Sequence, residues 1–438
     1  MQAIDRKKID RVLGDMGIDN IAQATIRQCV AVSNALESLT GEKFIHLEIG
    51  SPSIPASKIG IDAEKAALDR GVASVYPAIS GEPVLKETAS KFIKAFVDVN
   101  INPRGIIPTV GSMQGGYNLL LECSQLNTKK DTILYIDPGF PVQHTQAEVL
   151  GIKSKGFDIY KYRGEKLRAK LESYLCKGNI CAILYSNPNN PAWVCLTPAE
   201  LKIIGELATK YDVIVLEDLA YFCMDFRNDK SKPFEPPFQP SIAKYTDNYV
   251  LMISSSKMFS YAGERIAIVA ISDKLYGREY PNLKRRYHIA RFGDSFSLVY
   301  LYTASSGTSH APQFALAAMM KASIEGKYNF VKTTAEYGRR AKLAKEIFER
   351  HGFSIVYPKD LDTNIADGFF FTAGYGRMDS RTLLMELMRC GIIAIALDTT
   401  GSKQYGMRVC VSLLAPDSIF KTLDERLGIF ENLQKNKK

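Results

Sequence analysis

Chemistry-bearing residues recur where short apolar segments of this chain end. A primary amine, Lys257, follows the segment YVLMISSS, and an acid, Asp218, ends the segment VIVLED. A glycine-rich run, GSMQGG, begins at the last residue of the segment IIPTVG. Aromatic, amide and hydroxyl side chains follow the other apolar segments. In chain order these positions are Ser112, Met113, Phe140, Asn190, Asp218, Tyr221, Ser254, Lys257 and Arg265.

Together these residue types supply what one phosphorylated aromatic ligand needs. Backbone N–H groups at a helix N-terminus, with hydroxyls and an arginine, bind an anion. An aromatic ring can stack on the ligand, and a lysine amine becomes both nucleophile and base once its pKa falls. Taken singly, each position has a simpler explanation: a turn, a core side chain, a helix cap or a surface lysine. Their joint occurrence at successive segment ends favours one site.

The elements that position these residues form a repeating pattern. Continuous apolar segments alternate with helical stretches, which predicts a three-layer α/β fold with a mainly parallel sheet and helices on both faces. In such sheets ligands bind beyond the carboxyl ends of the strands. One helix start is marked at Thr197-Pro198-Ala199-Glu200 by a capping box and a first-turn proline. The expected strands are 106–111, 132–138, 181–188, 213–218, 249–256 and 266–272.

Composition and charge exclude several classes of protein. Lys and Arg outnumber Asp and Glu by 56 to 47, but the excess is spread along the chain and no nucleic-acid-binding module is present. The densest basic cluster, Lys284–Arg286, is expected on a solvated surface. Eight cysteines at irregular spacing predict neither a zinc site nor a disulfide framework, and the N-terminus lacks the apolar part of a signal peptide. We expect a cytoplasmic protein without metal, nucleic acid or membrane partners.

Four features of the chain resemble one known family. The segments SSSK…GER, NPNNP and DLAY, and the order of the strands, resemble the class I and II aminotransferases, which are aspartate aminotransferase-like pyridoxal-phosphate enzymes of fold type I. The resemblance runs from about residue 45 to about 412. It implies pyridoxal 5′-phosphate as cofactor and transfer of an amino group from an amino acid to a 2-oxo acid.

The resemblance assigns cofactor roles to matching positions. Lys257 is similar to the lysine that holds the cofactor as a Schiff base and later shuttles a proton. Asp218 is similar to the carboxylate that keeps the pyridine nitrogen protonated. Tyr221 and Asn190 match the pair that bonds the phenolic oxygen, and Phe140 matches the stacking ring. The expected phosphate ligands are Ser112, Met113, Ser254 and Arg265.

Substrate binding and assembly are also implied by the resemblance. Arg408, in GMRVCVS, is similar to the arginine that binds the α-carboxylate, with Gly50 and Asn190 beside the substrate. Tyr76, in YPAISG, is similar to a tyrosine that reaches the phosphate of a neighbouring subunit, which implies a homodimer. The expected domains are a large cofactor-binding domain (51–310) and a smaller α+β domain built from 1–50 and 311–438.

Two alternative functions remain open, and one position departs from the sequence pattern of the family. The same cofactor site would serve a β-eliminating C–S lyase, and a non-catalytic regulator could retain the fold. The departure is Trp193, the only tryptophan, where the family usually has a small residue after Asn190-Pro191. Because an indole tolerates the torsions of glycine poorly, we expect an altered turn but an intact Asn190 contact. The amino donor and the role of the proline-rich loop 232–240 stay unassigned.

Overall fold

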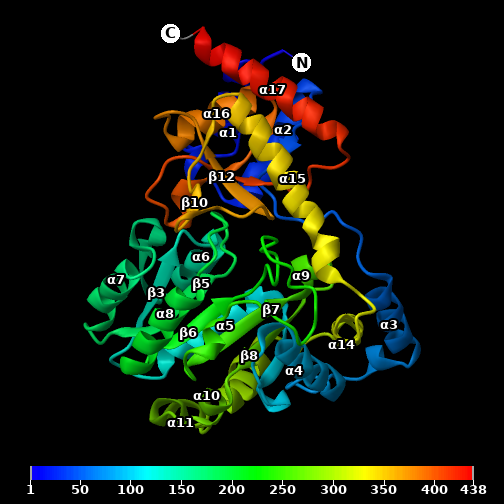
Figure 1. The fold of residues 1–438 in the computed structure, drawn as a ribbon, viewed down its shortest axis with the longest axis vertical. Helices are drawn as coiled ribbons and strands as arrows, with labels where there is room; N and C mark the ends of the chain where they lie inside the picture. Colours follow the sequence, from blue (N-terminus) through cyan, green and yellow to red (C-terminus); the bar gives the residue numbers. More distant parts are fainter. Residues whose placement is uncertain (1, 437–438) are drawn as a thin grey trace.

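A central sheet organises the larger part of the molecule (Figure 1). The structure, a computed structural model, describes residues 2–436, and within them seven strands pair in the order β2-β8-β7-β6-β5-β3-β4. These strands are β2 (Ile106–Val110), β3 (Thr132–Asp137), β4 (Lys153–Asp158), β5 (Ile180–Ser186), β6 (Ile214–Asp218), β7 (Tyr249–Ser254) and β8 (Ile266–Ile271).

The strand directions confirm a mainly parallel sheet. Strands β3, β4, β5, β6 and β7 pair parallel to their neighbours, whereas β8 pairs antiparallel with both β7 and β2. Every segment expected to be a strand forms one. The edge strand β4 has the sequence KSKGFD and was not anticipated, because four of its six residues are exposed and give no apolar run.

Helices cover both faces of this sheet, as the three-layer prediction requires. One hydrophobic core joins the sheet to α4, α7, α8 and α14, and a second joins its other face to α5, α6, α10, α11 and α12. The capping box predicted at Thr197 is confirmed at the start of α8. The helices of this part are α3 (Lys58–Asp69), α4 (Pro83–Val97), α5 (Gly111–Gln125), α6 (Pro141–Val149), α7 (Lys166–Leu175), α8 (Pro198–Lys210), α9 (Ser255–Met258), α10 (Asp273–Gly277), α11 (Pro281–Tyr287), α12 (Phe292–Ser295), α13 (Tyr302–Ser305) and α14 (His310–Ile324).

The two ends of the chain form a second, smaller body at the top of Figure 1. Its core combines residues from both ends, such as Ile9 and Leu36 with Leu387 and Phe430. A sheet of order β14-β15-β12-β9 lies inside it, and β1 pairs parallel with β13. Its elements are α1 (Arg6–Asp15), α2 (Ile26–Thr40), β1 (Ile45–His46), α15 (Phe330–Arg350), β9 (Ser354–Ile355), β10 (Lys359–Asp360), β11 (Thr363–Asn364), β12 (Phe370–Gly374), α16 (Ser380–Arg389), β13 (Ile392–Ile393), β14 (Ile395–Ala396), β15 (Met407–Cys410) and α17 (Ser418–Lys435).

The long helix α15 connects the two bodies (Figure 1). Its first turn, with Phe330 and Val331, belongs to the core of the large body, and its later residues from Tyr337 to Phe348 belong to the core of the small one. Among the helices of residues 2–436, none is long and apolar enough to cross a membrane.

Candidate active site

The amine of Lys257 lies at the carboxyl end of β7, in the first turn of α9. Its Nζ donates a hydrogen bond to the carbonyl of Gly50 and lies 5.3 Å from the centre of the Phe369 ring. Burial lowers the pKa of Lys257 to about 8, and the positive charges of Arg408 and Arg265 act in the same direction. A substantial fraction of the amine is therefore neutral near pH 8, as a nucleophile or base requires.

A buried carboxylate, Asp218, ends the neighbouring strand β6. Its Oδ2 accepts a hydrogen bond from Gln143 Nε2 at 2.8 Å, and its Oδ1 accepts one from the Ala220 backbone at 3.0 Å. Burial raises the pKa of Asp218 to about 6 because these two bonds do not offset the lost hydration of the charge. A cation placed beside Asp218 would restore its ionised form.

Three predicted residues from distant segments meet at one point. Asn190 Nδ2 donates to the Tyr221 hydroxyl at 3.3 Å, and Arg408 Nη1 donates to Asn190 Oδ1 at 3.2 Å. The Arg408 guanidinium lies over the Phe370 ring, 4.4 Å from its centre, and is almost fully buried. A buried cation whose Nε has no hydrogen-bond partner among the described residues is suited to bind a carboxylate.

An anion-binding arrangement lies at the start of α5. Gly111 begins the helix with φ +66°, and a Cβ added to it would come within 2.5 Å of Arg265 Nη2. No side chain of the described residues caps this N-terminus, so the first N–H groups of the predicted ligands Ser112 and Met113 remain directed outward. The Ser254 hydroxyl instead accepts a hydrogen bond from the backbone of Ser256 at the start of α9.

Two of the predicted site residues, Phe140 and Tyr76, make none of the contacts described so far. Phe140 precedes α6 and accepts, through its backbone carbonyl, a hydrogen bond from the Gln143 backbone. Gln143 in turn donates to Asp218, so Phe140 lies one turn before the residue that bonds this carboxylate. Tyr76 stands apart on the surface and is 87% exposed, next to exposed Val75. A surface hollow of about 720 Å³ adjoins both residues and also includes His310.

Sequence reasoning missed Gln143 and Ser186. Ser186 Oγ accepts a hydrogen bond from the Asn190 backbone at 3.1 Å and fixes the start of the turn. Neither residue forms part of a recognisable motif, and only the packing of α6 and β5 brings them to the site. The i+3 spacing of Gln143 from Phe140 was the one signal that could have pointed to it.

The turn after Asn190 is built around Trp193. Contrary to the expectation for an indole, Trp193 adopts the left-handed backbone conformation with φ +63°. Its side chain is fully buried, packs edge-on against Tyr221 with ring centres 5.2 Å apart, and fills the space beside Gly368. The packing compensates for the backbone strain, and Asn190 donates a hydrogen bond to the Tyr221 hydroxyl from this turn.

Substitutions at Trp193 should separate two contributions to the free energy of unfolding, the packing of the indole and the strain of its backbone. Trp193→Ala is expected to lower the free energy of unfolding by about 3–5 kcal/mol through the cavity that it leaves. Trp193→Gly should lose up to about 1 kcal/mol less, because glycine adopts the positive φ without strain. Urea unfolding followed by circular dichroism measures both values. An alanine variant as stable as the parent protein would show that the indole does not support this turn.

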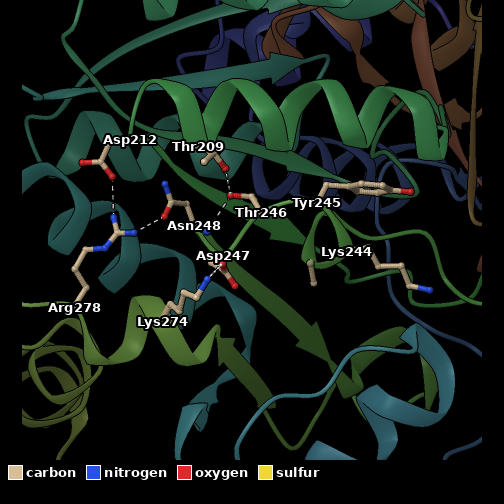
Figure 2. Close-up of a pocket in the computed structure, with 10 residues that line it drawn as sticks. Thr209, Asp212, Lys244, Tyr245, Thr246, Asp247, Asn248, Lys274 and Arg278 are labelled. Carbon is tan, nitrogen blue, oxygen red and sulfur yellow. Dashed lines mark hydrogen bonds and ion pairs between the residues drawn. The ribbon is translucent and has the colours of Figure 1, made fainter.

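A charged surface hollow elsewhere on the molecule is not a competing site. It measures about 610 Å³ and lies near the amino ends of β6 and β7 (Figure 2). Two ion pairs lie within it, since Arg278 donates to Asp212 at 2.8 Å and Lys274 donates to Asp247 at 2.6 Å. No predicted site residue lines it. The basic cluster Lys284–Arg286 lies on α11, exposed as expected.

Comparisons with known proteins agree with this arrangement. The family described as "Aminotransferase class I and II" matches residues 42–361. A probable aspartate aminotransferase of Methanocaldococcus jannaschii is 27% identical over 256 residues, which is 58% of this chain and 62% of that protein. The aspartate aminotransferase of Pyrococcus horikoshii is 28% identical over 233 residues, covering 52% and 56%. The matched part thus spans less than two thirds of either relative.

The fold is shared with solved structures. An aminotransferase from Mycobacterium tuberculosis superposes with a TM-score of 0.73 at 17% identity, covering 92% of this chain and 95% of that one. This similarity concerns the fold, whereas the family match rests on the sequence of residues 42–361. The chain therefore belongs to the class I and II aminotransferase family.

Proposed function

We propose that this chain is a pyridoxal-phosphate-dependent aminotransferase that moves an amino group from an amino acid to a 2-oxo acid. The observation that carries the proposal is the Lys257 amine, whose pKa burial lowers to about 8 beside the charges of Arg408 and Arg265. Family membership and the names of the relatives support the same activity. No observation favours β-elimination or a non-catalytic role.

The residues present fit this cofactor. The buried Asp218 suits a cationic ring nitrogen, and the Tyr221 hydroxyl, held by Asn190, can bond a phenolic oxygen. The uncapped start of α5 beside Arg265 suits a phosphate. When bound, pyridoxal phosphate supplies an aldehyde that bonds covalently to amines and a ring that draws electrons from the substrate Cα. The residues that we assign to hold it are Ser112, Met113, Phe140, Asn190, Asp218, Tyr221, Ser254, Lys257 and Arg265.

Each catalytic group of the chain then has one task. Arg408 binds the α-carboxylate of the substrate and fixes the orientation of Cα, with Gly50 and Asn190 alongside. With the cofactor bound, Lys257 Nζ would take the proton from the substrate Cα and return a proton at the next stage. Asp218 holds a proton on the ring nitrogen by its negative charge. The burial of Arg408 and Tyr221 excludes water from this step.

We also propose a homodimer in which Tyr76 reaches the active site of the neighbouring subunit. Its exposure supports this role, because an isolated chain leaves Tyr76, Val75 and Leu68 uncovered beside one hollow.

We propose a large domain of residues 51–310 and a small domain of residues 1–50 and 311–438, with one adjustment to the second boundary. Since α14 packs on α3 and α4, the small domain would begin within α15. A cytoplasmic location remains part of the proposal.

A half-reaction tests the proposed activity. Cofactor-loaded protein is mixed separately with L-aspartate, L-alanine, L-phenylalanine and L-cysteine, without any oxo acid. We expect at least one of them to yield one equivalent of pyridoxamine phosphate and of its oxo acid, measured by chromatography. Continuous release of pyruvate and ammonia would indicate β-elimination instead, and no conversion of any amino acid would contradict the proposal.

A further inference from the structure

A second buried carboxylate belongs to Glu48, a residue whose backbone contacts Arg408. Glu48 is fully buried, and its backbone carbonyl accepts a hydrogen bond from Arg408 Nη2. Its side-chain Oε1 lies 2.8 Å from His46 Nδ1. Within residues 2–436, neither Glu48 Oε2 nor Arg408 Nε has a hydrogen-bond partner, although both atoms are buried. The Glu48 carboxylate and the Arg408 guanidinium are thus both buried, each with one polar atom that lacks a partner in the described part of the chain, and Glu48 bonds the guanidinium directly through its backbone.

The electrostatics link these groups into one unit. The Glu48 charge acts on the Arg408 guanidinium, and both act on the buried thiol of Cys29 on α2. The hydrogen bond to Glu48 is the main cause that raises the pKa of His46 above its ordinary value. The His46 side chain is 27% exposed, so its proton can exchange with solvent while Glu48 and Arg408 stay buried.

Other charges face His46 from the elements packed around it. Glu37 on α2 lies 3.6 Å from His46 Nε2 and is itself paired with Lys43 at 3.0 Å. Arg426 on α17 donates a hydrogen bond to the Lys43 backbone carbonyl, and its charge interacts with that of Glu37. The charges that act on the imidazole are therefore those of Glu48 and Glu37, and these two carboxylates in turn face the cations Arg408, Lys43 and Arg426.

The charge balance changes when a substrate binds. Arg408 and Glu48 together are neutral, so the α-carboxylate of a substrate brings an uncompensated negative charge into a buried site. A proton on His46, hydrogen-bonded to Glu48, restores neutrality. Because coupling between two binding events is reciprocal, a carboxylate at Arg408 must then favour that proton.

We propose that His46 and Glu48 are positioning residues for substrate binding, which couple the α-carboxylate at Arg408 to a proton on His46. The inference rests on the proposed role of Arg408. The His46–Glu48 pair fixes the charge behind the guanidinium, and it makes the site selective for a carboxylate over a neutral group of the same shape.

Histidine NMR of the cofactor-loaded protein tests this coupling. The probe is propanoate, with propanamide as its neutral counterpart, and the chain has only five histidines to assign. Saturating propanoate is expected to raise the pKa of His46 by about one, and propanamide to leave it unchanged. Linkage then requires the Kd of propanoate to weaken about tenfold as pH rises through the two pKa values. An unchanged His46 titration would overturn the inference.

Variants separate this inference from the proposed function. His46→Gln keeps a hydrogen bond to Glu48 but loses the charge, so its Kd for propanoate should be about tenfold weaker at low pH and equal to the parent at high pH. The matched control is His351→Gln, since His351 also bridges two acids, Asp424 and Glu431, within the small body. It should keep the parent profile.

A further variant, Arg408→Gln, tests whether Arg408 itself binds the carboxylate. If this variant binds propanoate as tightly as the parent, Arg408 is not the carboxylate site, and both its proposed role and the coupling are refuted, while the half-reaction still tests the transamination itself. If binding requires Arg408 but His46→Gln retains the parent pH profile, only the coupling is refuted.

Discussion

Lys257→Ala is expected to lower kcat by at least about 10³-fold. The substitution removes the group that takes the Cα proton and the only covalent attachment proposed for the cofactor. Cofactor binding itself should persist, because the contacts at Asp218, Arg265 and the start of α5 remain. Steady-state transamination measures the loss. Borohydride treatment followed by peptide mass analysis should label a peptide containing residue 257 in the parent protein and leave the variant unlabelled.

Lys86 offers a matched control for Lys257. It is another lysine whose pKa burial lowers to about 8, and its Nζ bonds the backbone carbonyls of Ser80 and Ile106 on the large body. Lys86→Met should cost stability but leave kcat within a few-fold of the parent. Full activity of Lys257→Ala, or borohydride labelling at Lys86, would refute the assignment of the reactive amine.

Asp218→Asn is expected to lower kcat by about 10²–10³-fold, the usual cost of removing one preorganised electrostatic group. Asparagine keeps the shape and can keep the contact with Gln143, but it cannot hold a proton on the ring nitrogen. The spectrum of the bound cofactor and the steady-state rate measure the two effects. Turnover within a few-fold of the parent would rule out the proposed role of the carboxylate.

The same substitution should stabilise the cofactor-free protein. Burial raises the pKa of Asp218 from 3.8 to about 6, so folding favours its protonated form. This group therefore stabilises the fold fully below about pH 4, and the contribution is lost as pH rises through about 6. At pH 8 Asp218→Asn should raise the free energy of unfolding by about 3 kcal/mol, measured by urea denaturation without cofactor.

Glu217→Gln is the control for the two effects predicted for Asp218→Asn, the loss of kcat and the gain in stability. Glu217 precedes Asp218 on β6, points to the other face of the sheet, and has a pKa that burial raises to about 7. Glu217→Gln should change stability at high pH without lowering kcat more than a few-fold. Equal losses of kcat in both variants would attribute the Asp218 effect to a general disturbance of β6.

Local patterns in the sequence determined the elements and the chemistry of this protein. Apolar runs predicted every strand of the large sheet except β4, whose residues are mostly exposed, and Thr197 with Glu200 predicted the start of α8. The reactive residues could be found because each follows a strand, and parallel strands bring their carboxyl ends to one edge. Periodicity and strand-end position are properties of contiguous residues, so one chain is enough to read them.

Only the tertiary structure determined which side chains and backbone groups hydrogen-bond to the reactive residues. Gln143 reaches Asp218 across 75 positions, Asn190 reaches Arg408 across 218, and Arg408 bonds Glu48 across 360. The sequence carries no local signal for such contacts, since a hydrogen bond depends on where two packed elements place their side chains. For the same reason the positive φ of Trp193 is visible only in the fold, where the packing of its indole compensates for the strain.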